Sequence, residues 1–597
     1  MRIAVVEKDR CQPRKCNFEC HHFCPIVRQG KPCVWMGEDN KAKISETLCI
    51  GCNICVVKCP FDAIHIINLP EELKEDLLQQ YGENAFRLYR LPVPRKGSVV
   101  GLLGANGIGK TTAIRILSGQ ELPNLGDWTA APSWQPAIDK YSATELGDYL
   151  RHVAAGNVKT ALKPQYVDKL PQAVKGKVGD LLRKTDERGA LAHVVDALAL
   201  GAVLDSDLAA LSGGELQRVA IAATALKEAD VYFFDEPSSY LDIGQRLRAA
   251  RMIRTLAAEK AVVVIEHDLA VLDFLADDVH VLYGTPAAYG IVTIPRPVRS
   301  SINVYLSGFL REENIRFRDT TIEFEAHPPR KDWQAHVLLE FPELEKSYES
   351  FRFRSQPGQI RVGEVVGVVG PNATGKTTFV KMLAGEIAPT RGTVDVKVKV
   401  SYKPQYVKGD YEGTVQELLY VALAEQAASP FFLHEIARPL DLEKLSAKSV
   451  DKLSGGELQR VAVALALARP AELYLLDEPS AYLDVEQRMV VAKTIRRVME
   501  KTGKSALVVD HDVYFIDLIA DSVMTFGGNP GVEGLCAGPF PMREGMNRFL
   551  ADVGVTFRRD KDTRRPRVNK EGSRLDVEQR ASGEYYYAVE DAAAQAE

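Results

Sequence analysis

The chain has 597 residues, 46% of them hydrophobic, and a formal net charge of −5 at pH 7. This length predicts roughly three or four domains, each with its own core. There is no apolar run of about 18 residues and no signal-peptide pattern, so we expect a cytoplasmic protein that neither spans a membrane nor enters a secretory route.

The first domain is marked by cysteines, since nine of the ten lie within residues 11–59. One run has the spacing C-x₂-C-x₂-C-x₃-C-P of bacterial ferredoxins, in which the fourth cysteine serves the other cluster. It consists of Cys49, Cys52, Cys55, Cys59 and Pro60, and a looser run upstream consists of Cys11, Cys16, Cys20, Cys24 and Pro25. These runs predict an α+β ferredoxin-like domain with two [4Fe–4S] clusters. Crossed pairing assigns one cluster to Cys49, Cys52, Cys55 and Cys24, and the other to Cys11, Cys16, Cys20 and Cys59.

A pair of structural zinc sites is the alternative for this domain, because thiolates at C-x₂-C spacing also bind Zn²⁺. The looser first run leaves the division of ligands open. Either site requires a reducing compartment. Cys33 and Cys536 lie outside both runs and are expected to be buried thiols.

Two glycine-rich loops follow apolar, strand-like runs, at Gly104–Thr111 after Val99–Leu103 and at Gly370–Thr377 after Val365–Val369. Both fit the phosphate-loop pattern, in which backbone N–H groups surround phosphate, the lysine neutralises charge and the threonine binds Mg²⁺. The predicted ATP-binding residues are Gly104, Asn106, Gly107, Gly109, Lys110, Thr111 and Thr112 in the first loop, and Gly370, Asn372, Gly375, Lys376, Thr377 and Thr378 in the second.

The motifs after each loop repeat almost in register. Lys-Pro-Gln-Tyr-Val stands at 163–167 and 403–407, and Leu-Ser-Gly-Gly-Glu-Leu-Gln-Arg at 211–218 and 453–460. Two further apolar runs end in Asp235-Glu236 and Asp477-Glu478, and His267 and His511 follow short apolar strands. The chain therefore contains two copies of one nucleotide-binding unit.

These motifs resemble those of the ATP-binding-cassette (ABC) ATPases, and the resemblance covers about residues 75–535. It implies two head-to-tail composite sites, one from Lys110 with Ser454 and one from Lys376 with Ser212. The remaining ATP-binding residues that it implies are Gln165, Gly213, Gly214, Glu215, Asp235, Gln405, Gly455, Gly456, Glu457 and Asp477.

The same resemblance implies the catalytic roles. Asp235 and Asp477 would hold Mg²⁺ through water, with Thr111, Gln165, Thr377 and Gln405 as further magnesium ligands. Glu236 and Glu478 would orient or deprotonate the attacking water, and His267 and His511 would fix the γ-phosphate. Tyr81 or Phe86 before the first loop, and Tyr348, Phe351 and Phe353 before the second, are candidates for stacking on adenine, with a core role as the alternative.

A ferredoxin-like domain followed by two fused cassettes resembles class E of the ABC proteins, the ribosome-recycling ATPases or RNase L inhibitor family. The implied fold is α/β: two P-loop ABC-type domains in tandem behind the α+β two-cluster domain. We expect an iron–sulfur domain at 1–72, a first cassette at 73–294, a hinge at 295–312, a second cassette at 313–535 and a C-terminal hinge and tail at 536–597.

The implied activity is ATP hydrolysis that splits ribosomes into subunits after termination or rescue, with movement of the iron–sulfur domain. The implied cofactors are ATP, Mg²⁺ and two [4Fe–4S] clusters. The implied partners are the ribosome, chiefly its small subunit and rRNA, and a release factor or Pelota-type rescue factor, with the protein itself a monomer. The alternatives are the motor subunit of a membrane transporter and ATP-gated electron transfer.

Two other features fit this resemblance. The first cassette carries an insertion within about 125–163, where Ser142–Glu145 reads as a capping box, and the family has a helix-loop-helix there that touches the small subunit. Basic residues occur at Pro295–Arg299 and crowd the C-terminal segment, as expected of a contact with phosphate backbones. The C-terminal ones are Arg558, Arg559, Lys561, Arg564, Arg565, Arg567 and Lys570.

Overall fold

The computed structural model describes residues 2–69, 73, 75–324, 336–394, 398–405 and 409–586, so the last two residues of the second Lys-Pro-Gln-Tyr-Val motif lie outside the described residues. The chain divides into two compact units. The first comprises most of the chain before residue 320 and the second most of the chain after it. Two short stretches, 240–247 and 268–274, belong to the second unit although they come earlier in the sequence.

The N-terminal domain has two small antiparallel pairs of strands and three short helices. The pairs are β1 (Arg2–Val6) with β4 (Ile64–Asn68) and β2 (Val34–Met36) with β3 (Ala42–Ile44); the helices are α1 (Glu19–His22), α2 (Pro25–Arg28) and α3 (Ile54–Lys58). Its core combines aliphatic side chains such as Ala4 and Ile64 with five buried cysteines. Little apolar surface is available in so small a domain, so the cysteine side chains themselves form part of the core.

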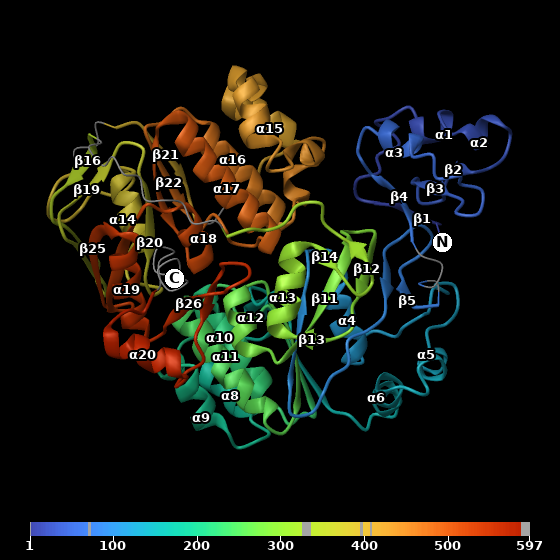
Figure 1. Ribbon diagram of the computed structural model, residues 1–597, viewed down its shortest axis with the longest axis horizontal. Helices are drawn as coiled ribbons and strands as arrows, with labels where there is room; N and C mark the ends of the chain where they lie inside the picture. Colours follow the sequence, from blue (N-terminus) through green and yellow to red (C-terminus); the bar gives the residue numbers. More distant parts are fainter. Residues whose placement is uncertain are drawn as a thin grey trace. The chain divides into compact units, whose positions relative to one another are not determined.

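The first cassette is built on one mixed sheet in the order β5-β6-β12-β11-β7-β10-β9-β8, with β13 beside β11 (Figure 1). The strands are β5 (Leu77–Gln80), β6 (Arg87–Tyr89), β7 (Val99–Leu103), β8 (Thr160–Lys163), β9 (Val231–Asp235), β10 (Ala261–Ile265), β11 (Asp278–Thr285), β12 (Tyr289–Val292) and β13 (Arg296–Pro297). The neighbouring strands β11, β7, β10, β9 and β8 run parallel. Strands β7, β9 and β10 are buried along their whole length, which explains their continuous apolar sequences.

The helices of this region follow the strands in the usual alternation. They are α4 (Lys110–Leu117), α5 (Gln135–Lys140), α6 (Glu145–Ala154), α7 (Leu170–Ala173), α8 (Val178–Thr185), α9 (Leu191–Ala197), α10 (Gly213–Ala225), α11 (Ile243–Ala257) and α12 (Leu269–Leu275). Short 3₁₀ turns lie at Gly201–Val203 and Leu208–Ala210.

The second cassette repeats the sheet strand for strand, in the order β17-β18-β25-β24-β20-β23-β22-β21. The strands are β17 (Leu344–Ser347), β18 (Arg352–Ser355), β20 (Val365–Val369), β21 (Val400–Lys403), β22 (Leu473–Asp477), β23 (Ser505–Val509), β24 (Ser522–Asn529) and β25 (Glu533–Pro541), with a separate pair β16 (Val337–Phe341) and β19 (Gly358–Arg361). The helices are α14 (Lys376–Leu383), α15 (Val415–Leu423), α16 (Gly455–Ala468), α17 (Val485–Thr502) and α18 (Val513–Ile519). Irregular turns lie at Ala424–Ala428, Phe432–Ala437, Leu442–Leu445 and Val450–Lys452. Strand β25 extends across residue 535, where the sequence suggests a domain boundary.

The insertion in the first cassette contains the helices α5 and α6, but the expected capping box at Ser142 does not form. Thr144 is the N-cap of α6 instead, and its hydroxyl accepts a hydrogen bond of 3.2 Å from Gly147 N. Thr144 has the extended backbone that an N-cap requires, with φ −126° and ψ 157°. The helix therefore begins two residues later than the sequence pattern suggests.

Connecting segments follow each cassette. After the first come α13 (Val298–Ser307) and the pair β14 (Phe309–Leu310) and β15 (Ile315–Arg316), and after the second come α19 (Met542–Val553), the pair β26 (Phe557–Arg559) and β27 (Pro566–Val568), and α20 (Arg574–Ser582). Among the described residues, none of the helices combines the length and the apolar character that a bilayer crossing requires.

Several arginines of the C-terminal basic cluster form ion pairs within the protein. These arginines are therefore not available for the contact with RNA that the sequence suggests. Arg567 lies 2.5 Å from the Asp273 carboxylate, and Arg565, which has no exposed surface, lies 3.5 Å from it. Arg559 lies 2.7 Å from Asp517. Lys561, Arg564 and Lys570 are exposed and make no such ion pair with any residue that the structure describes. The expected contact with phosphate therefore applies best to these three.

A buried histidine makes the first sheet sensitive to acid. In the first sheet, His280 of β11 lies opposite Leu102 of β7. Met524 of β24 has the equivalent position in the second sheet, where it lies opposite Val368. Burial lowers the pKa of His280 to about 4, and the contact of 2.7 Å between its Nδ1 and Thr293 O opposes this shift in part. An unfolded histidine has a pKa of about 6.5, so below that pH the unfolded state binds more protons and stability falls.

We expect the first sheet to lose about 2 kcal/mol of stability between pH 7 and pH 5 through this group. Hydrogen exchange in β11, corrected for the intrinsic pH dependence, measures the change. The matched variant is His280→Met, which introduces the residue of the second cassette and should flatten the profile. An equally steep profile in that variant would assign the effect to other groups.

Candidate functional site

Both glycine-rich loops lead directly into a helix whose first residue is the predicted phosphate-binding lysine. The Lys110 Nζ donates to Gly104 O at 2.9 Å and to Ala105 O at 2.6 Å. In the second copy, the Lys376 Nζ donates to Gly370 O at 2.8 Å and to Pro371 O at 2.6 Å. Each loop thus wraps around its own lysine at a helix N-terminus, an arrangement suited to polyphosphate.

The acidic pair at the end of each central strand is brought together with the other predicted catalytic residues. In the first cassette, the Gln165 Nε2 donates to Glu236 Oε1 at 2.6 Å, and the His267 Nε2 lies 3.6 Å from the same oxygen. In the second, the distances from Glu478 are 2.6 Å to Gln405 and 3.2 Å to His511. The same constellation has formed twice.

The backbone at both glutamates is unusual. Glu236 has φ 48° and Glu478 has φ 49°, in the left-handed region that larger L-residues seldom adopt. Such strain of about 1–3 kcal/mol persists where the surrounding structure enforces it, and it is concentrated at functional sites.

The predicted magnesium ligands face one another within each cassette. The Thr111 hydroxyl donates to Asp235 at 2.9 Å, and the Thr377 hydroxyl donates to Asp477 at 2.8 Å. Burial, and secondly the adjacent glutamate, raises the pKa of each aspartate to about 6. Hydroxyl and carboxylate oxygens are suitable ligands for Mg²⁺, whose charge favours the ionised carboxylate.

Sequence reasoning missed two residues that hold the acidic pair in place in each copy. The Lys163 Nζ donates to the carbonyl of Asp235 at 2.8 Å and the Gln217 Nε2 donates to that of Glu236 at 2.7 Å. The corresponding bonds of the second copy are Lys403 to Asp477 at 2.7 Å and Gln459 to Glu478 at 2.6 Å. Burial lowers the pKa of both lysines to about 8. The lysine and the glutamine each recur at the same position of a repeated motif, and this repetition is the signal from which both could have been predicted.

The signature serines begin long helices, α10 and α16. Ser212 and Ser454 are N-caps with complete capping boxes, in which Glu215 and Glu457 bond back to the serine backbone at 2.8 Å. The glycines Gly213, Gly214, Gly455 and Gly456 lie in the first helical turns. Exposed helix N-termini of this kind bind anions.

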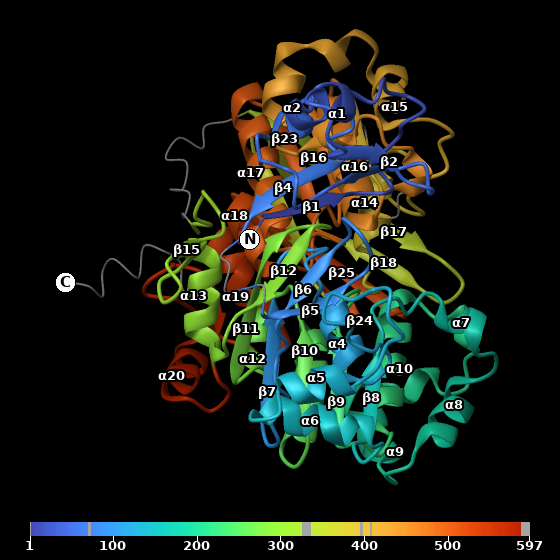
Figure 2. The same ribbon diagram turned by 90° about the vertical axis from the view of Figure 1, so that its right-hand side faces the viewer.

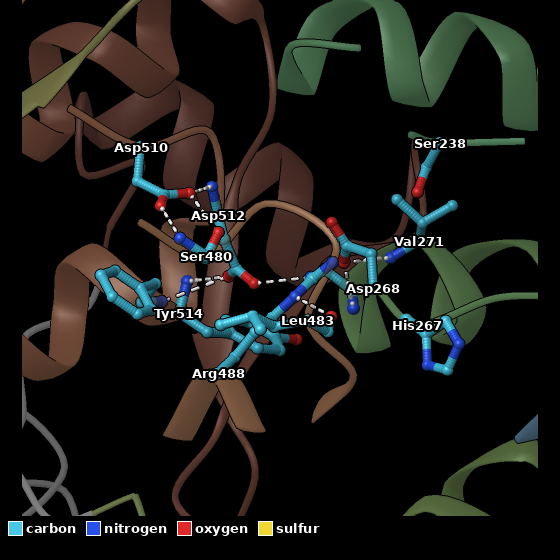
Figure 3. Close-up of polar contacts among 12 residues, drawn as sticks. Ser238, His267, Asp268, Val271, Ser480, Leu483, Arg488, Asp510, Asp512 and Tyr514 are labelled. Carbon is cyan, nitrogen blue, oxygen red and sulfur yellow. Dashed lines mark hydrogen bonds and ion pairs between the residues drawn. The ribbon is translucent and has the colours of Figure 1, made fainter. Parts of the chain in front are cut away.

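Carboxylates fix the segments around both histidines that the sequence predicts to be catalytic. In the second cassette, Asp510 accepts hydrogen bonds from the Ser480 hydroxyl at 2.7 Å and from Asp512 N at 2.9 Å (Figure 3). Asp512 caps α18 and binds the Arg488 guanidinium at 2.9 Å. In the first, Glu266 accepts from Ser238 at 2.8 Å and from His267 N at 2.7 Å.

The stretch 240–247 contacts the second phosphate loop, with which it shares a compact unit. Asp242 accepts a hydrogen bond of 2.9 Å from Asn372 N, and the Asn372 side chain donates to Tyr240 O at 3.1 Å. This stretch follows Glu236 by only a few residues in the sequence, although Glu236 belongs to the first unit.

The predicted adenine-stacking residues divide into two groups. Tyr81 and Tyr348 are about half exposed, and the Tyr81 hydroxyl lies 3.2 Å from that of Thr112. Phe86 packs against the first loop at Gly109.

The prediction that Phe353 stacks on adenine is wrong. Its ring has 0% exposure and packs against Phe379 and Phe526, so it presents no face to a base. Phe351, which is only half-buried and packs against Gly375, occupies the position of Phe86.

Two further glycines, also missed from the sequence, support the loops from neighbouring strands. A Cβ on Gly290 of β12 would lie 1.9 Å from Ile108 O, and one on Gly534 of β25 would lie 2.1 Å from Thr374 O. Each phosphate loop therefore rests on a strand that has no side chain at that point.

We expect Gly534→Ala to lower ATP affinity at the second site at least tenfold, because overpacking of about 1–3 kcal/mol displaces the loop. The control is Gly527→Ala in the adjacent strand β24, where a Cβ meets nothing within 4 Å. Titration with a fluorescent ATP analogue in a Lys110→Ala background isolates the second site. Equal affinities of the two alanine variants would contradict this role.

None of the ten cysteines forms a disulfide with another described cysteine, and nine of them lie in the N-terminal domain. A cavity there is lined by Cys24, Cys33, Cys49, Cys52 and Cys55. Burial and the neighbouring thiols of Cys59 and Cys11 raise the pKa of Cys20 to about 12. Each of the two groups contains cysteines of both runs, and the crossed pairing stays a prediction. Cys33, hydrogen-bonded to Cys24, is an additional thiol beside the first group.

This donor set fits an iron–sulfur cluster, because the thiols of Cys24, Cys49, Cys52 and Cys55 line one cavity. Four cysteine thiolates are the usual ligands of a [4Fe–4S] cluster.

Comparisons with known proteins give a consistent result. The family model described as ABC transporter matches residues 94–239 and 356–481. A possible Fer4-like domain in RNase L inhibitor matches residues 1–32, and a 4Fe-4S binding domain matches residues 42–65. They confirm the tandem ATPase fold, the ferredoxin-like domain and the [4Fe–4S], ATP and Mg²⁺ cofactors.

Relatives cover nearly the whole chain. An uncharacterized ABC transporter ATP-binding protein of Methanocaldococcus jannaschii is 52% identical over 99% of this chain and 98% of its own. Translation initiation factor RLI1 of Saccharomyces cerevisiae is 45% identical over 98% of each chain. Among solved structures, a chain of ribosome-bound archaeal Pelota and ABCE1 has a TM-score of 0.95 and 55% identity, covering 98% of this chain and 99% of that one.

Proposed function

Because the chain belongs to class E of the ABC ATPases, the RNase L inhibitor family, we propose that it splits ribosomes into subunits after termination or rescue. The observation that carries this proposal is the combination, in one chain, of two complete ATP sites with a cysteine-rich domain. A transporter motor has no use for such a domain. The likeness to a ribosome-bound relative with Pelota supports the proposed partners.

The ATP sites are proposed to be composite, with Lys110 opposite Ser454 and Lys376 opposite Ser212. The support for this arrangement is that each copy carries both halves of such a site, a phosphate loop and a signature serine that caps a helix. Glu236 and Glu478 orient the attacking water, and His267 and His511 contact the γ-phosphate.

The clusters are proposed to be structural. The iron–sulfur domain at 1–72 moves as a body against the ribosome or the rescue factor when the cassettes close. The protein acts in the cytoplasm as a monomer, and the boundaries 73–294, 295–312, 313–535 and 536–597 describe its remaining parts. Bound clusters supply the cross-links that such a small domain needs for rigidity.

The test is density-gradient sedimentation of ribosomes with the anaerobically reconstituted protein, ATP and a Pelota-type factor. We expect separation into subunits, and a Glu236→Gln, Glu478→Gln double variant should remain on the small subunit. Intact ribosomes with unbound protein would refute the proposal. Reduction of a small acceptor that rises with ATP would favour electron transfer instead.

A further inference from the structure

The histidine of the second site, His511, stands between two buried aspartates, Asp510 and Asp512. Asp510 binds the segment that follows the second acidic pair, because it accepts hydrogen bonds from the Ser480 hydroxyl at 2.7 Å and from Ser480 N at 3.1 Å. One oxygen of Asp512 caps helix α18 by accepting from Tyr514 N at 2.9 Å. Both neighbours of the histidine are thus fixed through their side chains.

An arginine of α17 binds the second oxygen of this cap. The Arg488 Nη1 donates to Asp512 at 2.9 Å, and its Nε donates to Leu483 O at 2.9 Å. Helices α17 and α18 lie side by side (Figure 2), so a side chain near the start of α17 reaches the residue that caps α18. The planar guanidinium makes both bonds at once. It therefore connects the loop after Glu478 with the residue after His511.

The loop between Glu478 and Arg488 has a backbone that requires support. Glu478 has φ 49° and Tyr482 has φ 64°, both in the left-handed region. Backbone of this kind persists only where the surrounding structure enforces it. The bond from Arg488 to the Leu483 carbonyl holds the loop at the residue next to Tyr482.

The first cassette repeats these bonds in the two stretches that belong to the second unit. Arg246 donates from Nε to Leu241 O at 2.7 Å and from Nη1 to Asp268 at 2.5 Å. Asp268 follows His267 directly, and it caps the next helix by accepting from Ala270 N at 2.8 Å. The arrangement of arginine, loop carbonyl and aspartate has therefore formed twice.

The two arginines and the two aspartates form one charge cluster. Burial alone would lower the pKa of Arg488, but the carboxylates of Asp512 and Asp268 outweigh burial and raise this pKa. Figure 3 shows Arg488 together with both aspartates. The four side chains are between 6% and 15% exposed. A buried ion pair gives little net stability relative to well-packed apolar side chains, so its presence in both cassettes favours a role in positioning.

We propose that Arg488 and its counterpart Arg246 are positioning residues for ATP hydrolysis, because each holds the residue after the histidine against the loop that follows the glutamate. This inference rests on the roles proposed for Glu478 and His511, whose side chains lie 3.2 Å apart. A displacement of about 1 Å in such a pair can slow a reaction about 100-fold. ATP binding depends on the phosphate loop rather than on this distance, so affinity should be largely unaffected.

The test compares Arg488→Met with Arg497→Met in a Glu236→Gln background, in which only the second site is expected to hydrolyse ATP. Both arginines belong to α17, but Arg497 is exposed and lies 3.9 Å from the Glu435 carboxylate. We expect single-turnover hydrolysis to fall at least about tenfold in Arg488→Met, while equilibrium titration gives an ATP affinity within about threefold of the parent. Arg497→Met should change neither quantity, since exposed ion pairs contribute little.

A second variant separates positioning from stability. Arg488→Met leaves the Asp512 carboxylate buried without its partner, which should lower the melting temperature. The double variant Arg488→Met, Asp512→Asn removes that charge, and the asparagine oxygen can still cap α18. We expect the melting temperature to recover in the double variant while hydrolysis stays slow, because the connection to the Leu483 carbonyl is still missing. A purely structural role would restore the rate together with the stability.

Normal hydrolysis in Arg488→Met would overturn the inference, as would an equal loss in Arg497→Met or recovery of the rate in the double variant. If Arg488→Met does not fold, the double variant decides alone. Failure of the roles proposed for the glutamates looks different, because hydrolysis would then persist in Glu236→Gln, Glu478→Gln whatever residue stands at position 488. Ribosome splitting does not enter this assay, so its success or failure leaves the result unchanged.

Discussion

ATP hydrolysis is expected to fall about 10³-fold in the Glu236→Gln, Glu478→Gln double variant, because the carboxylates that orient and deprotonate water are removed. Glutamine has the same size, and its side-chain oxygen can still accept the bond that Gln165 or Gln405 donates at 2.6 Å. ATP affinity should therefore stay within about threefold of the wild type. Single-turnover hydrolysis and equilibrium titration measure the two quantities separately.

The control for this variant is Glu259→Gln, which makes the same change at an exposed position of the first unit. It should leave both quantities unchanged. The single variants test whether both sites turn over: if either one alone retains half of the rate, the sites work independently. A double variant with near-normal hydrolysis would remove both glutamates from the mechanism.

Loss of one of the two iron–sulfur clusters is the expected result of Cys24→Ala. Cys24 lines the cavity with Cys49, Cys52 and Cys55, although it lies next to the other cysteine run in the sequence. Iron content should fall from roughly eight to roughly four atoms per chain. Iron and sulfide analysis with electron paramagnetic resonance of the reduced protein measures this change.

Cys33→Ala is a stringent control because Cys33 lines the same cavity and is even less exposed than Cys24. Removing a thiol that is not a ligand leaves about eight irons per chain. If Cys33→Ala lost four irons and Cys24→Ala lost none, the ligand set would have to be revised. Loss of all eight irons in Cys24→Ala would mean that the clusters depend on each other for assembly.

The sequence predicted the elements that depend on local pattern. The runs Val99–Leu103 and Val365–Val369 are strands with these same bounds, because strands buried on both faces have continuous apolar sequences. The positions of Glu236 and His267 relative to each other also followed, because both come just after parallel strands of one sheet. The two copies of the nucleotide-binding unit strengthened these predictions, because each element has a counterpart at the matching position of the other copy.

Features that depend on three-dimensional packing could not be predicted in this way. Phe353 and Phe351 are two residues apart in the sequence, and only packing against Phe379 and Phe526 distinguishes the buried ring from the accessible one. The arginines Arg565 and Arg567 formed a basic cluster in the sequence, but their partner Asp273 is nearly 300 residues away. Likewise, the importance of Gly534 appears only when a loop lies against its strand.

The assignment of residues 240–247 and 268–274 to the second unit has a consequence for how the protein can be dissected. A fragment that ended near residue 320 would keep Asp273 but lose both arginines that neutralise it, leaving a buried charge of the kind that destabilises proteins by about 3–5 kcal/mol. The first cassette is therefore not expected to fold stably as an isolated fragment, although the two cassettes repeat one pattern. A gene fragment that ends near residue 320 should yield aggregated protein.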